Sequence, residues 1–506
     1  MEAIVKGNKL FIEGYTYYKS RTQKGKTYWD CIRTKTKECT GRAITSEPRP
    51  GVEKVTLYKG PAESAHLHAP NRDEVDATIL TQTLKRKAGE HPGQPPSQIL
   101  REELAGVSCG VLSQLPVREA LSKAMRRERR KSLPPNPQSL ADLGQVPTTY
   151  AKTLLGEQFL LYDSRADEED DDQYSDSSSE ESDERDRVLV FSTARNIEVL
   201  CQSRLWFVDG TFKTSPGIFT QIFTVMGLCR RSSSTENVAL PLVYAFLSRK
   251  TEEQYTDVLR ALKNAVTKYR VQGPCLPERI MSDFEKAIIN ACKKVFPEAQ
   301  VSGCFFHLGQ SVYRRLQSEG LQAMYNDADR RLKRYTHMLL ALAFVPLADV
   351  SDTFAMLKEE WRDEDDFMPV MTYFEKVYVH GIPARGRRRA VPVRYPPALW
   401  NQYAAAIAKD HRTNNVAEAW HNRFQVVVGK HHPDVYSSLK ELQREQGDTE
   451  IMIAELSLGR RVKAMPRKKW MDMQLRIQDV CSEYETYKKN DDVLGYLRTL
   501  SYNVTL

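Results

Sequence analysis

Two cysteines and two histidines near the N-terminus offer the ligands of a metal site: Cys31, Cys39, His66 and His68. Two thiolates and two imidazoles form the ligand set that tetrahedral structural zinc favours. His66 and His68 are one residue apart, so on a strand both side chains would project to the same face. The alternative is a small apolar module with buried thiols and unrelated surface histidines. A β-rich module of about 70 residues has a thin core, however, and this favours the zinc interpretation.

Two aspartates end apolar segments in the middle of the chain. Asp209 lies in LWFVDGTF, and Asp283 lies in ERIMSDFEKA. Carboxylates at the ends of buried strands are costly unless they are hydrogen-bonded, paired or bound to metal. On neighbouring strands the two would meet at one sheet edge, where a hard divalent cation such as Mg²⁺ would relieve their repulsion. The alternative is two turn-forming aspartates, since Asp-Gly is a common turn dipeptide.

A third acid lies on a segment with a helical pattern. In RTNNVAEAWHNRF, the side chains of Asn415, Glu418 and Asn422 share one helical face at positions i, i+3 and i+7. A polar stripe inside an otherwise apolar segment indicates a site. The alternative is a solvated helix face.

The segments around these acids have a mixed α/β pattern. RVLVFS, LWFVDGTF, IFTQIFTVMGL and VALPLVYAFLS are apolar and rich in β-branched and aromatic residues, as buried strands are. EQYTDVLRALKNAVTKY and KAIINACKKVF have helical spacing, whereas ERIMSDF and AQVSGCFFHL read as strands. From residue 318 onward the pattern is helical and amphipathic.

The remaining parts differ in character. Residues 1 to about 70 alternate like short strands. The next zone contains helix-compatible pieces broken by the proline-rich turns HPGQPP and LPPNP. It ends in DEEDDDQYSDSSSEESDERD, which cannot bury enough apolar surface to fold and is expected to be a solvated linker.

The charge balance points to a polyanionic partner. The net charge is +8, but 13 acidic and 3 basic residues lie between Asp163 and Arg187. The rest of the chain holds 71 basic and 53 acidic residues, a net charge of +18, and nucleic acid is the first candidate for a partner. Nine scattered cysteines argue against a secreted disulfide framework, and no apolar run is long enough for a membrane span. The N-terminal segment has no long apolar core, so a signal peptide is not expected.

Three basic clusters could contact phosphates without reading base sequence. They are equally consistent with nuclear-import signals or solvated faces. The cluster at 385–389 is the best candidate for a loop that grips a DNA strand. The clusters are Arg126, Arg127, Arg129, Arg130 and Lys131; Arg385, Arg387, Arg388 and Arg389; and Arg460, Arg461, Lys463, Arg467, Lys468 and Lys469.

The N-terminal segment resembles a FLYWCH-type zinc finger. The resemblance rests on GYTYYKSRTQKGKTYWDCIRTKTKECTGRA followed by HLH, and it includes Tyr28 and Trp29 just before the first cysteine. At Asp30 the chain departs from the family, which usually has a basic residue there, and this puts one DNA contact in doubt. The resemblance implies a β-sheet zinc module that binds DNA or, less often, protein.

Residues from about 188 to 430 resemble the catalytic domain of Mutator-like element (MULE) transposases. DGTF, SDFEKA, GCFFHLGQ and TNNVAEAWHNRF match the family's blocks in order and separation. The resemblance implies an RNase H-like fold with a helical insertion, and a catalytic triad of Asp209, Asp283 and Glu418. Such carboxylates hold two Mg²⁺ or Mn²⁺ ions about 3.5 to 4 Å apart, for in-line attack of a water or a DNA 3′-hydroxyl on phosphorus. Cys304 and His307 match the family's C-x-x-H block. They are expected either to support the site near the DNA backbone or to be a packed thiol and a hydrogen-bonded histidine.

The expected architecture is therefore multi-domain α/β, with a small β-rich zinc module and an RNase H-like catalytic domain interrupted by an all-helical insertion. The expected function is a metal-dependent DNA transposase in the nucleus, acting on double-stranded DNA as a homo-oligomer. A domesticated, transposase-derived DNA-binding regulator without catalysis is the first alternative, and a FLYWCH-type adaptor that binds protein is the second. The predicted divisions are 1–72, the zinc finger; 73–187, a helical and acidic linker; 188–317, the first part of the core; 318–405, the insertion; 406–445, the helix with Glu418; and 446–506, a C-terminal helical region.

Overall fold

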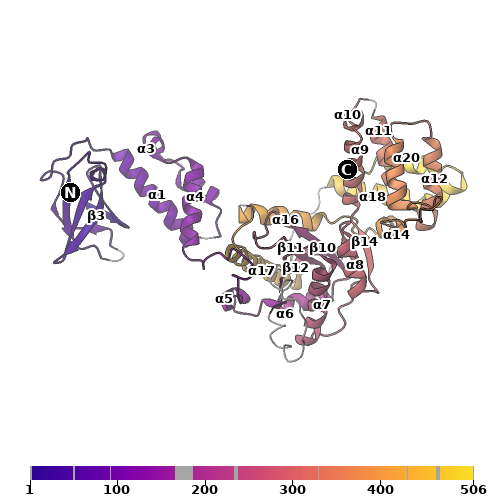
Figure 1. Ribbon diagram of the computed structural model, residues 1–506, viewed down its shortest axis with the longest axis horizontal. Coiled ribbons are helices and arrows are strands. Elements are labelled where there is room, and N and C mark those ends of the chain that lie inside the picture. Colours follow the sequence, from indigo (N-terminus) through magenta and orange to yellow (C-terminus); the bar gives the residue numbers. More distant parts are fainter. Residues whose placement is uncertain are drawn as a thin grey trace. The chain divides into compact units, whose positions relative to one another are not determined.

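The chain forms two compact units, Met1–Pro135 and Asn136–Leu506 (Figure 1). The computed structural model describes residues 3–49, 52–91, 93–165, 186–232, 237–328, 330–429, 431–462 and 468–504. Most of the predicted acidic linker, residues 166–185, lies outside the described residues. The finer predicted boundaries at 72, 187, 317, 405 and 445 stay predictions.

The first unit begins with an antiparallel sheet, in which the described strands have the order β6-β1-β2-β3-β4-β5-β7. Alternation of side chains puts Thr27, Trp29 and Cys31 of β4 on the buried face. The indole of Trp29 donates a hydrogen bond of 2.9 Å to the hydroxyl of Thr45, which satisfies its buried N–H. The strands are β1 (Ala3–Lys6), β2 (Lys9–Ile12), β3 (Tyr15–Gln23), β4 (Lys26–Cys31), β5 (Arg42–Ser46), β6 (Lys54–Val55) and β7 (Leu57–Lys59).

Four helices complete the first unit, and the first, second and fourth share a small apolar core that includes Leu84, Ile99, Leu121 and Met125. The proline-rich turn HPGQPP separates the first two helices, as its sequence predicts. The helices are α1 (Arg72–Glu90), α2 (Pro96–Glu103), α3 (Cys109–Gln114) and α4 (Arg118–Arg130).

The second unit is built around a mixed sheet, in which the described strands have the order β14-β13-β10-β11-β12-β9-β8. Strands β10, β11 and β12 form an antiparallel meander, whereas β13 lies parallel to β10 and β14 lies parallel to β13. Strands β10 to β12 are almost continuously buried, which explains their apolar sequences. The strands are β8 (Leu160–Asp163), β9 (Val188–Phe191), β10 (Leu205–Thr211), β11 (Gln221–Arg230), β12 (Asn237–Leu247), β13 (Arg279–Ser282) and β14 (Gln300–Gly303).

Helices cover this sheet. In Figure 1 its strands lie between α16 and α7. Helices α6, α7 and α8 pack against the sheet and one another, and α16 and α17 do the same. The covering helices are α6 (Ala194–Cys201), α7 (Glu252–Lys268), α8 (Lys286–Val295), α16 (Asn415–Val428) and α17 (Val435–Ser457); the short α5 (Thr148–Ala151) packs against α17.

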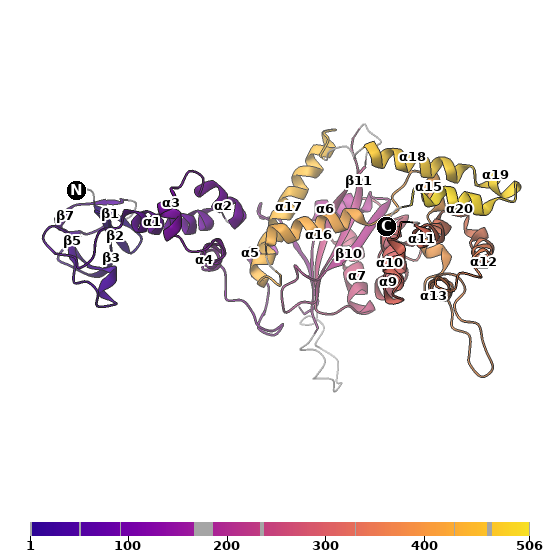
Figure 2. The same cartoon turned by 90° about the horizontal axis from the view of Figure 1, so that it is seen from above.

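A second group of helices packs beside the sheet and combines two segments far apart in the sequence (Figure 2). The hydroxyl of Tyr484 donates to Asp349 Oδ2 at 2.9 Å, and α11 packs against α20. The C-terminal segment therefore completes the core of the preceding helical segment. These helices are α9 (Phe305–Ser318), α10 (Gln322–Tyr325), α11 (Arg331–Ala341), α12 (Val350–Glu360), α13 (Met368–Phe374), α14 (Pro397–Trp400), α15 (Tyr403–Ile407), α18 (Lys468–Ser482), α19 (Tyr484–Lys489) and α20 (Val493–Ser501).

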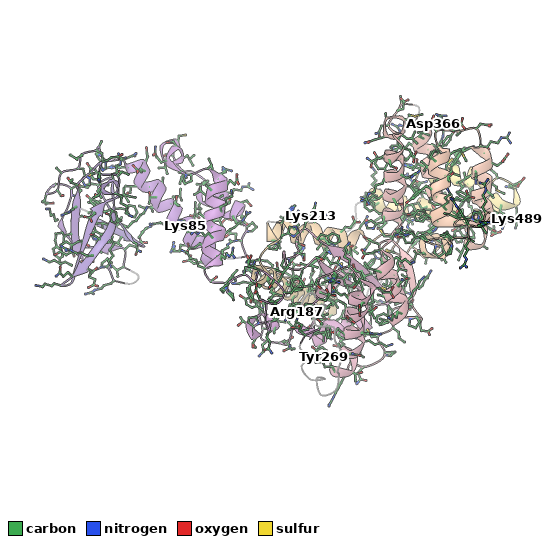
Figure 3. All side chains as sticks on the ribbon, viewed as in Figure 1. Lys85, Arg187, Lys213, Tyr269, Asp366 and Lys489 are labelled. Carbon is green, nitrogen blue, oxygen red and sulfur yellow. The ribbon has the colours of Figure 1, made fainter. Side chains whose placement is uncertain are left out.

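A buried ion pair joins the edge strand β8 to its neighbour β9. Arg187 lies just before β9, and its guanidinium binds the carboxylate of Asp163 at the end of β8 through contacts of 3.0 and 2.6 Å. Both side chains are buried, and Figure 3 labels Arg187 within the second unit. The sheet thus includes β8, which precedes the segment in which strands were expected.

Candidate functional site

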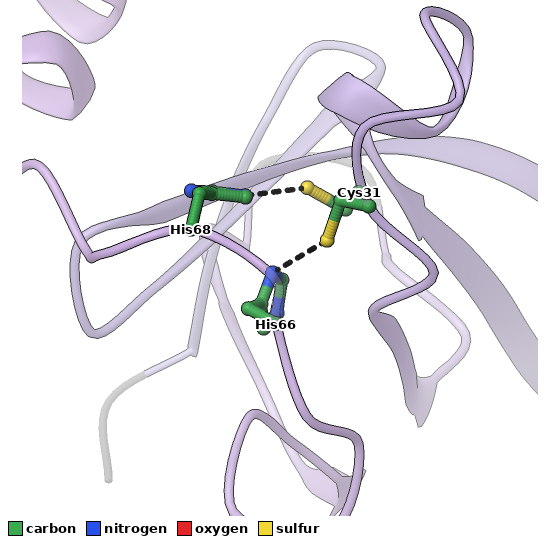
Figure 4. Close-up of side chains that lie close together, drawn as sticks. Cys31, His66 and His68 are labelled. Carbon is green, nitrogen blue, oxygen red and sulfur yellow. Dashed lines mark hydrogen bonds between the residues drawn. The ribbon is translucent and has the colours of Figure 1, made fainter.

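The four predicted zinc ligands converge in the first unit. Cys31 ends β4, Cys39 precedes β5, and the two histidines follow β7. One ligand atom from each of Cys31, Cys39, His66 and His68 lies within 4.8 Å of the others. Cys31 Sγ is 3.3 Å from His68 Nε2 (Figure 4), and Cys39 Sγ is 3.3 Å from His66 Nδ1. The two histidines lie in a loop rather than on the strand that would have put them on one face.

The nitrogen of each imidazole that faces away from the cluster also has a partner. The hydroxyl of Tyr17 is 2.7 Å from His66 Nε2, and the carbonyl oxygen of Ala69 is 3.0 Å from His68 Nδ1. Partners of this kind fix the orientation of zinc-binding imidazoles. Burial lowers the pKa of His66 to about 4, so its imidazole is neutral at pH 7, the form that binds a metal. The chemistry and placement of these donors fit a structural zinc ion.

A glycine provides the space that His66 occupies. A Cβ at Gly41 would lie 2.4 Å from Cε1 of that imidazole, closer than real Cβ atoms approach. The N–H of Gly41 also lies 3.3 Å from Cys39 Sγ, and its carbonyl accepts from the N–H of Cys31. The sequence gives no signal for this role, because Gly41 gains it only from the fold.

In the second unit, the three predicted acids come from different elements. Asp209 lies on β10, Asp283 directly follows β13, and Glu418 lies in the first turn of α16. Because β10 and β13 are parallel, their carboxyl ends lie at one edge of the sheet. The N–H groups of Gly210 and Asn414 hold this edge through local contacts: Gly210 donates to Asp209 Oδ1 and Asn414 donates to Cys304 Sγ.

Two histidines connect the acids. His307 Nδ1 lies 2.7 Å from Asp283 Oδ1, and its Nε2 lies 3.2 Å from Glu418 Oε1. His421 Nδ1 lies 3.2 Å from Asp209 Oδ2. His307 therefore bridges Asp283 and Glu418, whereas His421 contacts Asp209, and the three carboxyls lie close enough to interact electrostatically.

The acids of this cluster are buried and have few hydrogen-bond donors around them. Oδ1 of Asp283 and Oε1 of Glu418 are buried without a hydrogen bond of good geometry. Burial raises the pKa of both carboxyls, and the charge of Asp209 raises them further. Burial lowers the pKa of His307, but contacts with Asp283 and Cys304 outweigh this effect and raise the pKa to about 11. The imidazole is thus positively charged at neutral pH and lies where a cation would be attracted.

The carboxylates are less tightly gathered than the zinc ligands. Within the described ranges, the Cys31 cluster is the one group of His, Cys, Asp and Glu close enough for a single ion. To share a cation, Asp283 and Glu418 would have to turn from His307 towards each other.

The secondary structure around Cys304 differs from the predicted strand AQVSGCFFHL. Strand β14 ends at Gly303, and His307 lies in the first turn of α9. The strand expectation for these residues was therefore wrong, because the apolar run continues into a helix. Cys304 is fully buried and accepts the N–H of Asn414 at 3.1 Å, which ties the start of α9 to the start of α16.

The polar stripe of α16 is also shifted from its predicted position. Asn415 and Asn422 are exposed, whereas Asn414 and His421 are buried on the side of Glu418. The amide of Asn414 donates to the carbonyl of Val208 at 3.2 Å. Positions 414, 418 and 421 follow the spacing i, i+4 and i+7, which fits one helical face as well as the i, i+3 and i+7 of the predicted stripe, so the pattern alone could not distinguish them.

The basic segment at 385–389 forms an exposed two-residue hairpin turn. The backbones of Arg385 and Arg388 exchange two hydrogen bonds of 3.1 Å around Gly386, which has φ +57°. At its base, the hydroxyl of Tyr395 donates to the carbonyl of Phe284 at 2.5 Å, one residue after Asp283. The exposed side chains at the tip are Arg385, Arg387, Arg388 and Arg389.

The other two basic clusters differ from this hairpin. Arg129 donates to the backbone carbonyls of Ala88, His91 and Gln94, so it holds α4 to the C-terminal end of α1 and the loop that follows it. Lys463 and Arg467 lie outside the described residues. No described helix has the length and apolar character of a membrane span.

Two family models match the chain. Residues 205–311 match the MULE transposase domain, a range that includes Asp209 and Asp283. Residues 5–68 match the FLYWCH zinc finger domain, a range that includes all four Cys and His ligands. No curated protein matches the chain. The two matches confirm both predicted resemblances and support a transposase-like, DNA-binding protein.

Proposed function

We propose, from its MULE transposase domain and its FLYWCH zinc finger, that the protein is a metal-dependent DNA transposase. The observation that carries the proposal is the convergence of Asp209, Asp283 and Glu418 at one sheet edge. These acids come from positions up to 209 residues apart in the sequence. Because burying acids together is costly, their convergence indicates a function rather than a contribution to stability.

The second unit supports an RNase H-like catalytic fold. Three consecutive antiparallel strands, β10 to β12, are followed by two parallel strands that are each reached through a helix. The first two acids lie on adjacent strands of this sheet, and the third is on a helix packed against it. We assign the helices between α9 and α16 to the insertion that the family carries before its glutamate.

The carboxylate cluster fits a divalent cation by the chemistry of its donors. Asp283 Oδ1 and Glu418 Oε1 are buried carboxylate oxygens that contact the imidazole of His307 at 2.7 and 3.2 Å. Hard cations such as Mg²⁺ or Mn²⁺ prefer such oxygens, and Asp209, Asp283 and Glu418 would hold them. Bound there, a pair of ions would supply Lewis-acid activation of the attacking oxygen and stabilisation of the leaving oxygen at phosphorus.

The other residues of the cluster position the acids. His421 contacts Asp209 and the hydroxyl of Thr224, so it fixes the carboxylate on β10. The bond from Asn414 to Cys304 holds the helix with Glu418 against the one with His307. The exposed Arg385–Arg389 hairpin would contact phosphates of the DNA backbone.

The remaining features are consistent with a protein that acts on chromosomal DNA. We assign element-end recognition to the zinc finger, strand transfer to the acidic cluster, and the nucleus as the place of action. Element ends come in pairs, so we expect the protein to act as a homo-oligomer on double-stranded DNA. A domesticated regulator that binds DNA without cleaving it is the alternative, and it would use the same zinc finger.

A strand-cleavage assay separates these functions. Terminal-repeat DNA of the source element is incubated with Mg²⁺ or Mn²⁺ and with wild type or Asp283→Asn. We expect cleavage by wild type and none by the variant, while both bind the DNA with similar affinity. Binding without cleavage by wild type would support the regulator instead, and equal cleavage by both proteins would refute the assignment of Asp283.

A further inference from the structure

A cavity lined by aromatic side chains lies next to the acidic cluster. Its volume is about 560 Å³, within the range of pockets that hold small organic groups. Phe305 and Phe306 directly precede His307, and Asn415 begins the helix that carries Glu418. The cavity therefore shares its walls with the elements that position two residues of the proposed catalytic site.

A buried guanidinium also lines this cavity. Arg412 is 7% exposed, and its Nη1 is buried without a hydrogen-bond partner. Its Nη2 donates to Gln474, and its guanidinium carbon lies 5.2 Å from the ring centroid of Phe344. These contacts leave Nη1 of the guanidinium with no acceptor.

No acid in the described part of the chain forms an ion pair with Arg412. The nearest acid in sequence, Asp410, is instead 3.1 Å from Arg279. Burial lowers the pKa of Arg412 to about 10, so the group still carries its charge at neutral pH. A buried, charged arginine without a carboxylate is costly, and an anionic ligand would offset that cost.

The aromatic residues define the second part of the ligand. Trp470 is 50% exposed at the start of α18 and lines the cavity together with Phe305, Phe306 and Phe344. A tryptophan ring is rarely this exposed unless it binds a partner. Flat aromatic rings stack well on nucleobases. One anion site beside a set of aromatic rings matches a nucleotide, which has a phosphate beside a planar base.

We propose that this cavity binds one unpaired nucleotide of the DNA strand held at the acidic cluster. The base stacks among Trp470 and the phenylalanines, and Arg412 contacts the adjacent phosphate. The backbone places this pocket beside the cluster, because the N–H of Phe305 donates to the carbonyl of Arg412 at 3.1 Å. The inference rests on the proposed function, since it requires DNA at the site, but it concerns binding and requires no cleavage.

A binding assay without divalent cations tests the proposal. Full-length protein is titrated into a fluorescein-labelled duplex with one unpaired adenine and into the same duplex fully paired, and anisotropy is recorded. We expect wild type to prefer the duplex with the unpaired base by about tenfold, the contribution of one stacked base. Trp470→Ala should remove this preference while leaving binding to the paired duplex unchanged.

Matched controls come from the same helix. Leu475 and Arg476 are exposed on α18 outside the cavity lining, so Leu475→Ala and Arg476→Gln should keep the preference. Arg412→Gln should weaken binding to the duplex with the unpaired base and lower the salt dependence of log K by about 0.7. Arg412→Lys keeps the charge and should retain part of this binding. Because Arg412 is buried, circular dichroism checks the fold of both variants, and Trp470→Ala tests the proposal even if they fail to fold.

The outcomes separate this proposal from the proposed function. Equal affinity of wild type for both duplexes, or an unchanged preference in Trp470→Ala, would overturn the nucleotide pocket and leave the transposase proposal standing. Failure of wild type to bind either duplex would overturn both. If wild type prefers the duplex with the unpaired base but does not cleave DNA, the result would count against the catalytic assignment alone.

Discussion

His307 Nδ1 lies 2.7 Å from Asp283 Oδ1. The imidazole is on α9 and the carboxylate follows β13, so the contact joins the helical group beside the sheet to the end of β13. Its other nitrogen is within reach of Glu418, at 3.2 Å. His307 thus occupies the space between two acids that a shared cation would need.

Divalent cations should stabilise the wild-type protein. A ligand that binds only the folded state raises the free energy of unfolding by about 2.7 kcal/mol at one hundred times its dissociation constant. Mg²⁺ or Mn²⁺ should therefore raise the melting temperature of wild type by a few degrees, measured by differential scanning calorimetry. Asp283→Asn and Glu418→Gln should lose most of this rise, because each removes a charged ligand. An equal rise in both variants would show that the cations bind elsewhere.

Loss of one zinc ligand should unfold the zinc module. Cys31→Ser removes a thiolate from the site, and structural zinc contributes about 10 to 16 kcal/mol of apparent binding free energy in small modules. We expect about one zinc per chain in wild type and almost none in the variant, by elemental analysis. Cys109→Ser is the matched control, because Cys109 is an exposed thiol outside the cluster. Retention of zinc by Cys31→Ser would contradict the assigned ligand set.

The Gly41→Ala substitution should weaken zinc binding without removing any ligand. The added methyl group would lie 2.4 Å from His66 Cε1, so the imidazole would have to move from its place beside Cys39. We expect faster loss of zinc to a chelator, followed with a colorimetric zinc dye. Gly89→Ala is the control, since nothing lies within 4 Å of a Cβ there and alanine favours its helix. Identical release rates for the two variants would show that the Gly41 position tolerates a side chain.

Much of the fold follows from sequence patterns. Continuous apolar runs predicted β10 to β12, and helical spacing predicted α7 and α8. The short α6 was not expected, because eight residues give too little periodicity for a helix to be recognised. The packing of the C-terminal helices on the earlier helical segment could not be predicted either, since an apolar face does not identify its partner.

The candidate site was predicted only in part. The acids and zinc ligands were found by residue type and by resemblance, but Asn414 and His421 were missed. Two sets of positions that include Glu418 each fit one helical face, and only tertiary packing shows that Asn414 faces Val208 while Asn415 is exposed. Arg412 gave no signal because its importance comes from the absence of a nearby carboxylate in the described structure, a property of the fold.

The arginine hairpin should contribute to DNA affinity through charge. Replacing Arg385, Arg387, Arg388 and Arg389 together by glutamine should weaken binding and reduce the salt dependence of log K by about 0.9 for each phosphate that the hairpin no longer neutralises. The four-residue lysine variant is the control, because it keeps the charge and the turn at Gly386. Affinities at several salt concentrations, measured by anisotropy, give the slope. Weakened binding with an unchanged slope would indicate that these arginines act through structure rather than by neutralising phosphates.

The buried pair of Arg187 and Asp163 should stabilise the sheet edge. Asp163→Asn would leave the guanidinium of Arg187 buried without its charged partner, and breaking such a pair costs about 3 to 5 kcal/mol. We expect a decrease of this size in the free energy of unfolding, measured by denaturant titration of the isolated second unit if it folds alone, or of the full chain otherwise. The double variant Asp163→Leu with Arg187→Met should recover most of the decrease, because two apolar side chains replace both charges. If the single variant is destabilised by less than about 1 kcal/mol, the guanidinium must find another partner or reach solvent, and the pair is not what joins β8 to β9.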